Sequence, residues 1–201
     1  MLEDRARQKF GTEELAVVLS HYDLGVVESI TPFKRGSRQS PKVGVVCQRG
    51  KFLLKKRAHG RKSERKVDFA HGIQQHLAAA GFPLAKIVSP RTGQTTYTQL
   101  GSQIYELFEY ASGHAYDGTI SQTRDAGRTL ARFHQHLSDF ELPENAPTGV
   151  YHDTIGVRTA LNAIPSSIDK HDSVSGKEAE LLGLIQRLFE AYDEAAEQAN
   201  A

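Results

Sequence analysis

The sequence predicts an α+β fold in which a five-stranded antiparallel sheet with one crossing helix precedes a set of helices. Two observations predict this order. Up to Ser112-Gly113 the chain consists mainly of β-rich apolar runs, interrupted by one stretch of helical periodicity. After that point every periodic segment is helical. With 201 residues, of which 39% are hydrophobic, the chain is long enough to bury a core.

The first elements are a short helix and a three-stranded meander. Thr12 and the two glutamates after it precede apolar residues at helical spacing, which is typical of a capped helix, and we expect this helix to end near Gly25. Residues 26–33, 43–47 and 51–57 are β-rich and form the three predicted strands. A polar connection at 34–41 and a turn at Arg49-Gly50 join them.

The sheet is completed after a crossing helix. Apolar residues recur at helical spacing between residues 63 and 80, and Gly81-Phe82-Pro83 supplies a stop signal. Two further strands are predicted at 95–100 and 103–110. Helices are then expected at 123–137 and 178–198. This order places a domain boundary after residue 111, between a sheet part at 1–111 and the first helices of an incomplete helical part at 112–201.

Composition narrows the class of protein. The formal net charge of +1 argues against a dedicated polyanion binder. Apolar stretches are too short to span a bilayer, and the acidic N-terminus does not resemble a signal peptide, so we expect a cytoplasmic protein without membrane contact. The single cysteine, Cys47, lies in an alternating apolar run and is expected to be a buried structural thiol.

A basic run leaves one alternative function open. Residues 49–66 hold nine Lys or Arg and one acid, Glu64, and such a run can bind nucleic acid. That function also needs exposed aromatic residues or a helix that enters a groove, whereas Phe52 is the only aromatic residue in the run. These observations disfavour nucleic-acid binding.

The predicted sheet part has the element order of the small lobe of a protein-kinase-like fold. On its third strand Leu53 and Lys55 share a face, because side chains alternate. A kinase needs an ammonium at this place for the α- and β-phosphates, with an apolar neighbour over the adenine. The loop at 34–42 could cover the phosphates, with Gly36 allowing close backbone approach and Ser37 offering a donor. The alternative is a solvated strand lysine and an ordinary turn.

Four further segments contain residue types that could take part in binding or catalysis. At 105–113 a strand runs into small residues, where backbone groups could bind the adenine edge, although an edge strand entering a loop fits as well. His134 and His136 are two residues apart, so they do not share a helix face and are expected to pack rather than bind a metal. Asp139-Phe140-Glu141 and His152-Asp153 look like kinase motifs but lack the context of such motifs.

Seven short segments together resemble one family: the aminoglycoside phosphotransferase, choline kinase and homoserine kinase-like enzymes. They are YDLG at 22–25, GS at 36–37, FLLK at 52–55, LAAAGFP at 77–83, YE at 105–106, YASG at 110–113 and AGRTLARFH at 126–134. The resemblance covers about residues 12–140. It implies a small-molecule kinase that uses ATP and Mg²⁺ and phosphorylates a small hydroxyl- or amine-bearing acceptor.

The resemblance also implies roles for individual residues. Lys55 corresponds to the phosphate-binding lysine, and Gly36 and Ser37 belong to the loop that covers the nucleotide. The Glu109 carbonyl and the Ala111 N–H, on either side of Tyr110, form the hinge that binds adenine.

The sequence departs from the family at two places. The family's helix glutamate, which pairs with the lysine, should lie where this chain has Ala70 or Lys66, and Asp68, in preference to Glu64, is expected to replace it. The His-Gly-Asp catalytic loop and the Asp-Phe-Asp metal motif do not occur in the 201 residues. We therefore expect a partial or truncated chain, inactive alone, with the catalytic half beyond Ala201; a non-catalytic, pseudokinase-like nucleotide-binding module is the alternative.

Overall fold

The computed structural model describes residues 8–58, 63–144, 146–147, 159 and 176–200. The chain divides into two compact units, Met1–Pro147 and Thr148–Ala201. His152, Asp153 and Arg158 lie outside the described residues.

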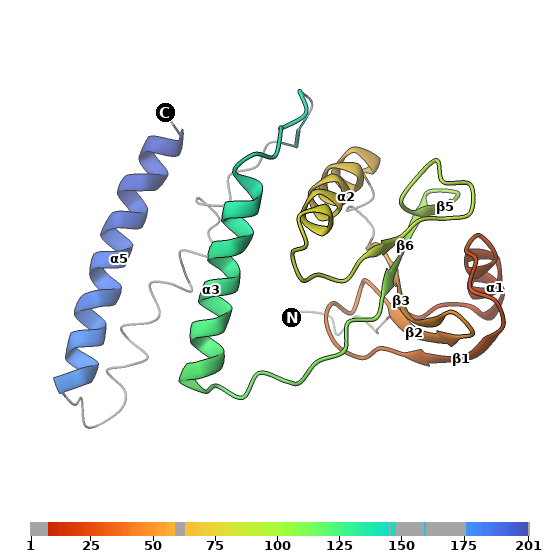
Figure 1. The fold of residues 1–201 in the computed structure, drawn as a ribbon, viewed down its shortest axis with the longest axis horizontal. Helices are drawn as coiled ribbons and strands as arrows, with labels where there is room; N and C mark the ends of the chain where they lie inside the picture. Colours follow the sequence, from red (N-terminus) through yellow and green to blue (C-terminus); the bar gives the residue numbers. More distant parts are fainter. Residues whose placement is uncertain (1–7, 59–62, 145, 148–158, 160–175, 201) are drawn as a thin grey trace, which may run out of the picture. The chain divides into compact units, whose positions relative to one another are not determined.

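Within its described residues, the first unit contains one antiparallel sheet and three helices (Figure 1). The strands follow the order β1-β2-β3-β6-β4, and β5 pairs with β6 outside this path. The elements are α1 (Thr12–Ser20), β1 (Val27–Pro32), β2 (Lys42–Cys47), β3 (Gly50–Lys56), α2 (Glu64–Ala79), β4 (Ile87–Val88), β5 (Thr98–Leu100), β6 (Gln103–Glu109) and α3 (Ile120–Leu137). The second unit contains α5 (Gly176–Asn200).

The predicted α+β class and the order of the predicted elements are confirmed, with two corrections. The sheet has six strands rather than five, because the two-residue strand β4 pairs with β6. Helix α1 ends at Ser20 and not near Gly25, with His21 as its C-cap. Gly25 lies beyond the helix in a left-handed conformation, with φ of 68°.

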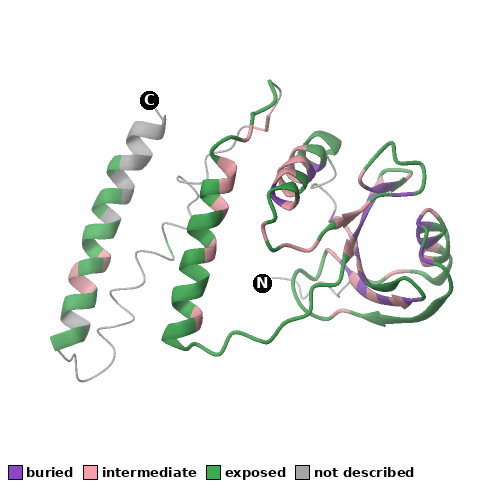
Figure 2. Cartoon of the chain, in the orientation of Figure 1, coloured by how far each residue is buried: buried purple, intermediate pink, exposed green. Residues whose placement is uncertain are grey.

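One face of the sheet forms the main core with α1. Alternating residues of β2 and β3, including Val43, Val45, Phe52 and Leu54, are buried against Val18 and other residues of α1. Figure 2 shows buried segments, in purple, on strands of the sheet and on α1. Cys47 is buried in the same core, as its alternating run predicts. The opposite face of β3 is therefore left for polar side chains.

Helix α2 packs near the β5–β6 end of the sheet. Its Val67 is buried with Tyr97 and Ile104 in a second, smaller core. The segment after α3 lies along this helix: Phe140 makes edge-to-face contacts with Phe69 and with His76. Further along, Arg65 donates to the carbonyl of Ala146 at 3.0 Å. The chain that follows α3 thus contacts both ends of α2.

Helices α3 and α5 carry exposed apolar residues. No described residue of α3 is buried, and its Leu130 is 56% exposed. In α5, Leu181, Leu184 and Leu188 are exposed. Among the described helices, none combines the length and the apolar character needed to cross a membrane.

Candidate functional site

The candidate site is built on the open face of β3. Because side chains alternate along the strand, Phe52 and Leu54 enter the core while Leu53 and Lys55 face the other way. Leu53 is half-buried, and the side chain of Lys55 is 29% exposed. Lys55 is thus anchored on a strand, while part of its side chain stays accessible to solvent.

Glu106 on the neighbouring strand β6 supplies the counter-charge of Lys55. The strand register places the two residues directly opposite each other, and Lys55 Nζ lies 2.9 Å from Glu106 Oε2. The other carboxylate oxygen, Oε1, accepts hydrogen bonds from Arg57 Nη2 at 2.7 Å and from His71 Nε2 at 2.8 Å. The Glu106 side chain is only 1% exposed, so two hydrogen-bond donors at Oε1 and the ammonium of Lys55 near Oε2 replace the water that it has lost.

The electrostatics of this cluster follow from its donors. Burial alone would raise the pKa of Glu106, but the hydrogen bonds from His71 and Arg57 and the charge of Lys55 outweigh burial and lower its pKa to about 2. Glu106 is therefore a carboxylate at neutral pH. Two cationic side chains, Lys55 and Arg57, contact one carboxylate, so positive groups outnumber negative ones in this cluster.

His71 connects α2 to this cluster. Its Nδ1 lies 2.6 Å from the hydroxyl of Thr96, while Nε2 faces Glu106. An ionised carboxylate only accepts hydrogen bonds, so Nε2 must carry a proton, whereas the Thr96 hydroxyl can donate or accept. The ring is 1% exposed and packs edge-on against Tyr97 and Phe108.

The structure corrects the partner expected for Lys55. Asp68 was expected to pair with it from the helix, but the carboxylate at Lys55 is Glu106. Val67 and His71 are one helical turn apart and are both buried, which shows the side of α2 that faces the sheet. Asp68 lies about 100° around the helix from Val67 and is exposed.

Glu106, His71, Arg57 and Thr96 were missed as site residues by sequence reasoning. Two features of the sequence indicate the first two of these residues, Glu106 and His71. Glu106 interrupts an apolar strand that was predicted to join the same sheet as Lys55, and His71 follows Val67 on the apolar stripe of the helix.

The loop between β1 and β2 contains Gly36 and Ser37. Gly36 has φ of 84°, a left-handed conformation that favours glycine. A Cβ atom at this position would lie 2.9 Å from Lys42 Nζ. Ser37 is exposed, and its hydroxyl accepts a hydrogen bond from the Gln39 N–H at 3.2 Å. The loop is therefore a tight turn that exposes its backbone and the Ser37 side chain.

The predicted hinge follows the end of β6. The Tyr110 N–H donates to the Lys51 carbonyl of β3, and the Glu109 N–H donates in the opposite direction, to Lys86. Because backbone groups alternate along an extended chain, those of Glu109 and Ala111 point to the same edge. No described residue accepts a hydrogen bond from the Ala111 N–H. A cavity of about 250 Å³ next to this segment is lined by residues of β1, β2 and β3 and by Tyr110.

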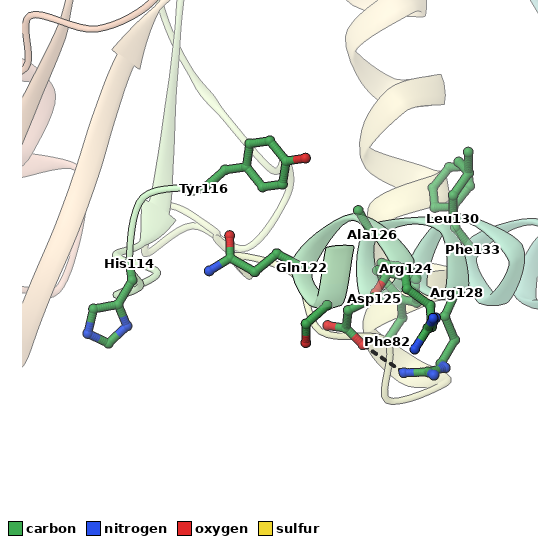
Figure 3. Close-up of a pocket in the computed structure, with 12 residues that line it drawn as sticks. Phe82, His114, Tyr116, Gln122, Arg124, Asp125, Ala126, Arg128, Leu130 and Phe133 are labelled. Atoms are coloured by element: carbon green, nitrogen blue, oxygen red, sulfur yellow. Dashed lines mark hydrogen bonds and ion pairs between the residues drawn. The ribbon is translucent and has the colours of Figure 1, made fainter. Parts of the chain in front are cut away.

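A larger cavity of about 800 Å³ lies along α3 and contains none of the predicted site residues. It is lined by aromatic and charged side chains, among them Phe82, Tyr116 and Arg124 (Figure 3). The dashed line in Figure 3 marks the ion pair of Asp125 with Arg128 at 3.0 Å. The residues that line this cavity include no buried titratable cluster like the one around Glu106. The cavity is therefore not taken as the candidate site, although it is larger than the cavity next to the hinge.

No group of three His, Cys, Asp or Glu side chains that could hold a metal ion lies within the described ranges.

Several cations of the basic run at 49–66 are already paired: Lys55 and Arg57 with Glu106, Lys56 with Glu14, and Arg49 with Asp23. These pairs reduce the charge that the run offers to a nucleic acid.

Comparison with solved structures shows a shared fold. An aminoglycoside phosphotransferase from Alicyclobacillus acidocaldarius is 18% identical with a TM-score of 0.55, and the match covers 100% of this chain and 57% of that one. An amicoumacin kinase in complex with AMP-PNP, Ca²⁺ and Ami is 12% identical with a TM-score of 0.60, and the match covers 90% of this chain and 53% of that one. A spectinomycin phosphotransferase in complex with ADP and spectinomycin is 12% identical with a TM-score of 0.50, and the match covers 96% of this chain and 58% of that one.

The chain therefore spans little more than half the length of these structures. No curated protein matches its sequence. Residues 29–198 match the model of the phosphotransferase enzyme family, APH, and this match spans most of the chain. The chain belongs to the phosphotransferase enzyme family.

Proposed function

We propose that the first unit is the nucleotide-binding lobe of an ATP-dependent phosphotransferase that acts on a small molecule. The observation that carries the proposal is the ion pair of Lys55 with Glu106, on the open face of a kinase-like sheet in a member of this family. A lysine held by a buried carboxylate has a fixed position, and phosphoryl transfer depends mainly on positioning and on charge neutralisation.

Each predicted residue has a place in this proposal. The Lys55 ammonium would contact the α- and β-phosphates, supported by the surplus charge around Glu106. Leu53 would cover the adenine, and the Gly36–Ser37 turn would close over the phosphates. The hinge would bind the adenine edge through the Glu109 carbonyl and the Ala111 N–H, next to Tyr110. Glu106 takes the role expected for Asp68.

Magnesium and the chemical step are not assigned to these residues. One structural neighbour contains AMP-PNP and Ca²⁺, which supports the use of a nucleotide and a divalent metal in this fold. No metal-binding cluster lies in the part of the chain that the structure describes. We propose that the catalytic base and the Mg²⁺-binding carboxylates belong to the part of the kinase fold outside the region that this chain covers.

The acceptor is proposed only as a class. The matched structures include enzymes named for aminoglycosides, amicoumacin and spectinomycin, so a small hydroxyl- or amine-bearing molecule is the proposed acceptor. We propose a cytoplasmic location, where ATP is supplied.

Calorimetric titration of the 201-residue chain with ATP and Mg²⁺ tests the proposal. Lys55→Ala should weaken binding about 10- to 100-fold, because a hydrogen bond to a charged group contributes roughly 1.5–3 kcal/mol. Lys56→Ala is the matched control: it removes an ion pair from the same strand, 2.6 Å from Glu14, but on the opposite face. It should leave ATP affinity unchanged.

Two results would contradict the proposal: no ATP binding by the wild-type chain, or equal affinity in Lys55→Ala and wild type. Binding without ADP formation by the complete kinase fold, in the presence of acceptors, would instead favour the non-catalytic module.

A further inference from the structure

Helix α2 is connected to Lys55 by the buried His71, which contacts Glu106, the partner of Lys55. We infer that His71 is a positioning residue of the nucleotide site: it orients the Glu106 carboxylate, which in turn holds the Lys55 ammonium in place. This inference rests on the proposed function for its connection to ATP. Because His71 is only 1% exposed, it would act through Glu106 and Lys55 and not by direct contact with the nucleotide.

The geometry supports a role in orientation. Glu106 Oε1 accepts from His71 on α2 and from Arg57, which directly follows β3, and these two donors fix the plane of the carboxylate. Oε2 is then aimed at Lys55, 2.9 Å away. With only Arg57 on Oε1, the carboxylate could rotate about its terminal torsion, which is soft in glutamate. Lys55 would then sample more positions.

The placement of His71 is hard to explain by packing alone. It follows Val67 by one turn on the sheet-facing side of α2, where an apolar residue would satisfy the helical pattern. A buried histidine costs free energy unless both ring nitrogens find partners, and here both do, in Thr96 and Glu106. The hydroxyl of Thr96 fixes the ring so that Nε2 points at the carboxylate.

A comparison of ATP and adenosine separates this role from a structural one. His71→Leu keeps an apolar side chain of moderate size but removes the donor, whereas His71→Gln keeps an N–H near the position of Nε2. Because Lys55 would act only on phosphates, His71→Leu should weaken ATP binding on the order of tenfold and leave adenosine binding unchanged. His71→Gln should restore most of the ATP affinity.

The inference is overturned if His71→Leu weakens ATP and adenosine equally, or if the Leu and Gln variants bind ATP alike. In a Lys55→Ala background, His71→Leu should cause no further loss, because its effect passes through Lys55. If His71→Leu does not fold, His71→Gln and His71→Asn decide the question, since only the longer amide reaches Glu106; the same ratio of ATP to adenosine affinity in both would refute the role.

A second measurement needs no nucleotide. Reductive ¹³C-methylation labels the lysine amines and keeps their charge, and the Lys55 signal is assigned by its loss in Lys55→Arg. In the wild type this signal should differ from those of exposed lysines, collapse toward them in His71→Leu, and persist in His71→Gln. An unchanged signal in His71→Leu overturns the inference. Failure of the wild type to bind ATP, together with a responding signal, would refute the proposed function alone.

Discussion

Replacing Glu106 by glutamine tests the central cluster most directly. Glu106→Gln keeps the shape of the side chain and an oxygen that can accept from His71, but it removes the negative charge. Lys55 and Arg57 would then lie at a buried amide without their counter-charge, with side chains only 29% and 16% exposed. Leaving buried charges without a partner destabilises a fold far more than losing a surface ion pair.

The magnitude follows from the pKa of the group. A pKa of about 2 in the folded chain, against 4.5 ordinarily, corresponds to about 3 kcal/mol of preference for the charged form at neutral pH. That value agrees with the roughly 3–5 kcal/mol lost when one partner of a buried ion pair is removed. We therefore expect Glu106→Gln to lower the free energy of unfolding by about 3 kcal/mol at pH 7.

The effect should depend on pH with a defined sign. Because the folded pKa is lowered, the stabilisation is fully present above about pH 4.5 and is lost as pH falls through about 2. The glutamine variant has no such group. The difference in unfolding free energy between wild type and variant should therefore shrink to roughly half at pH 3.

Urea unfolding followed by far-UV circular dichroism at pH 7 and pH 3 measures both quantities. Glu28→Gln, at an exposed position of β1, is the control and should change stability little at either pH. Equal stability of Glu106→Gln and wild type at pH 7 would refute the reasoning. So would a difference that stays constant between pH 7 and pH 3, because the charge of Glu106 would then not be its source.

Two further predictions concern the loop and α2. Gly36→Ala should destabilise the chain by about 1 kcal/mol, because Gly36 has φ of 84°, whereas Gly113→Ala, with open space around its Cβ position, should be nearly neutral in the same thermal melts. Equal melting temperatures for the two variants would contradict this. Phe140→Ala should lower the free energy of unfolding by about 1–2 kcal/mol, because the ring contacts with α2 are lost. Leu142→Ala, at a residue that is 71% exposed, is the control and should have little effect. Similar effects of the two substitutions would show that the Phe140 ring does not stabilise the packing against α2.

The orientation of β3 could be predicted from the sequence, but the partner of its lysine could not. Strand alternation is a local property, and it correctly placed Leu53 and Lys55 on one shared face, which the structure shows to be the face opposite the core. The pairing of Lys55 with Glu106 depends instead on the register of two strands that are far apart in the chain. Their registration is set by the whole sheet, so no local spacing reveals it.

Two of the corrections, the additional strand β4 and the replacement of Asp68 by Glu106, also have physical reasons. Strand β4 has only two residues, Ile87 and Val88, which is too short for an alternating pattern to be recognised. Asp68 is the expected partner only if the carboxylate lies on the helix, where the helix phase leaves no suitable glutamate. Glu106 is an acid inside an apolar strand, and such a position also indicates a paired carboxylate, since an unpaired buried carboxylate is rare.

The location of Glu106 on the sheet limits how strongly helix motion can control the lysine. Where the carboxylate lies on a helix, displacement of that helix breaks the ion pair and inactivates the site. Here the ion pair joins neighbouring strands of one sheet, so it can survive a displacement of α2 that removes only the hydrogen bond of His71. If Lys55 binds phosphate as proposed, the coupling free energy between helix position and phosphate affinity is bounded by about one charge-assisted hydrogen bond, roughly 1.5–3 kcal/mol. Such a lobe would respond to its surroundings by graded changes in affinity rather than by switching between active and inactive states.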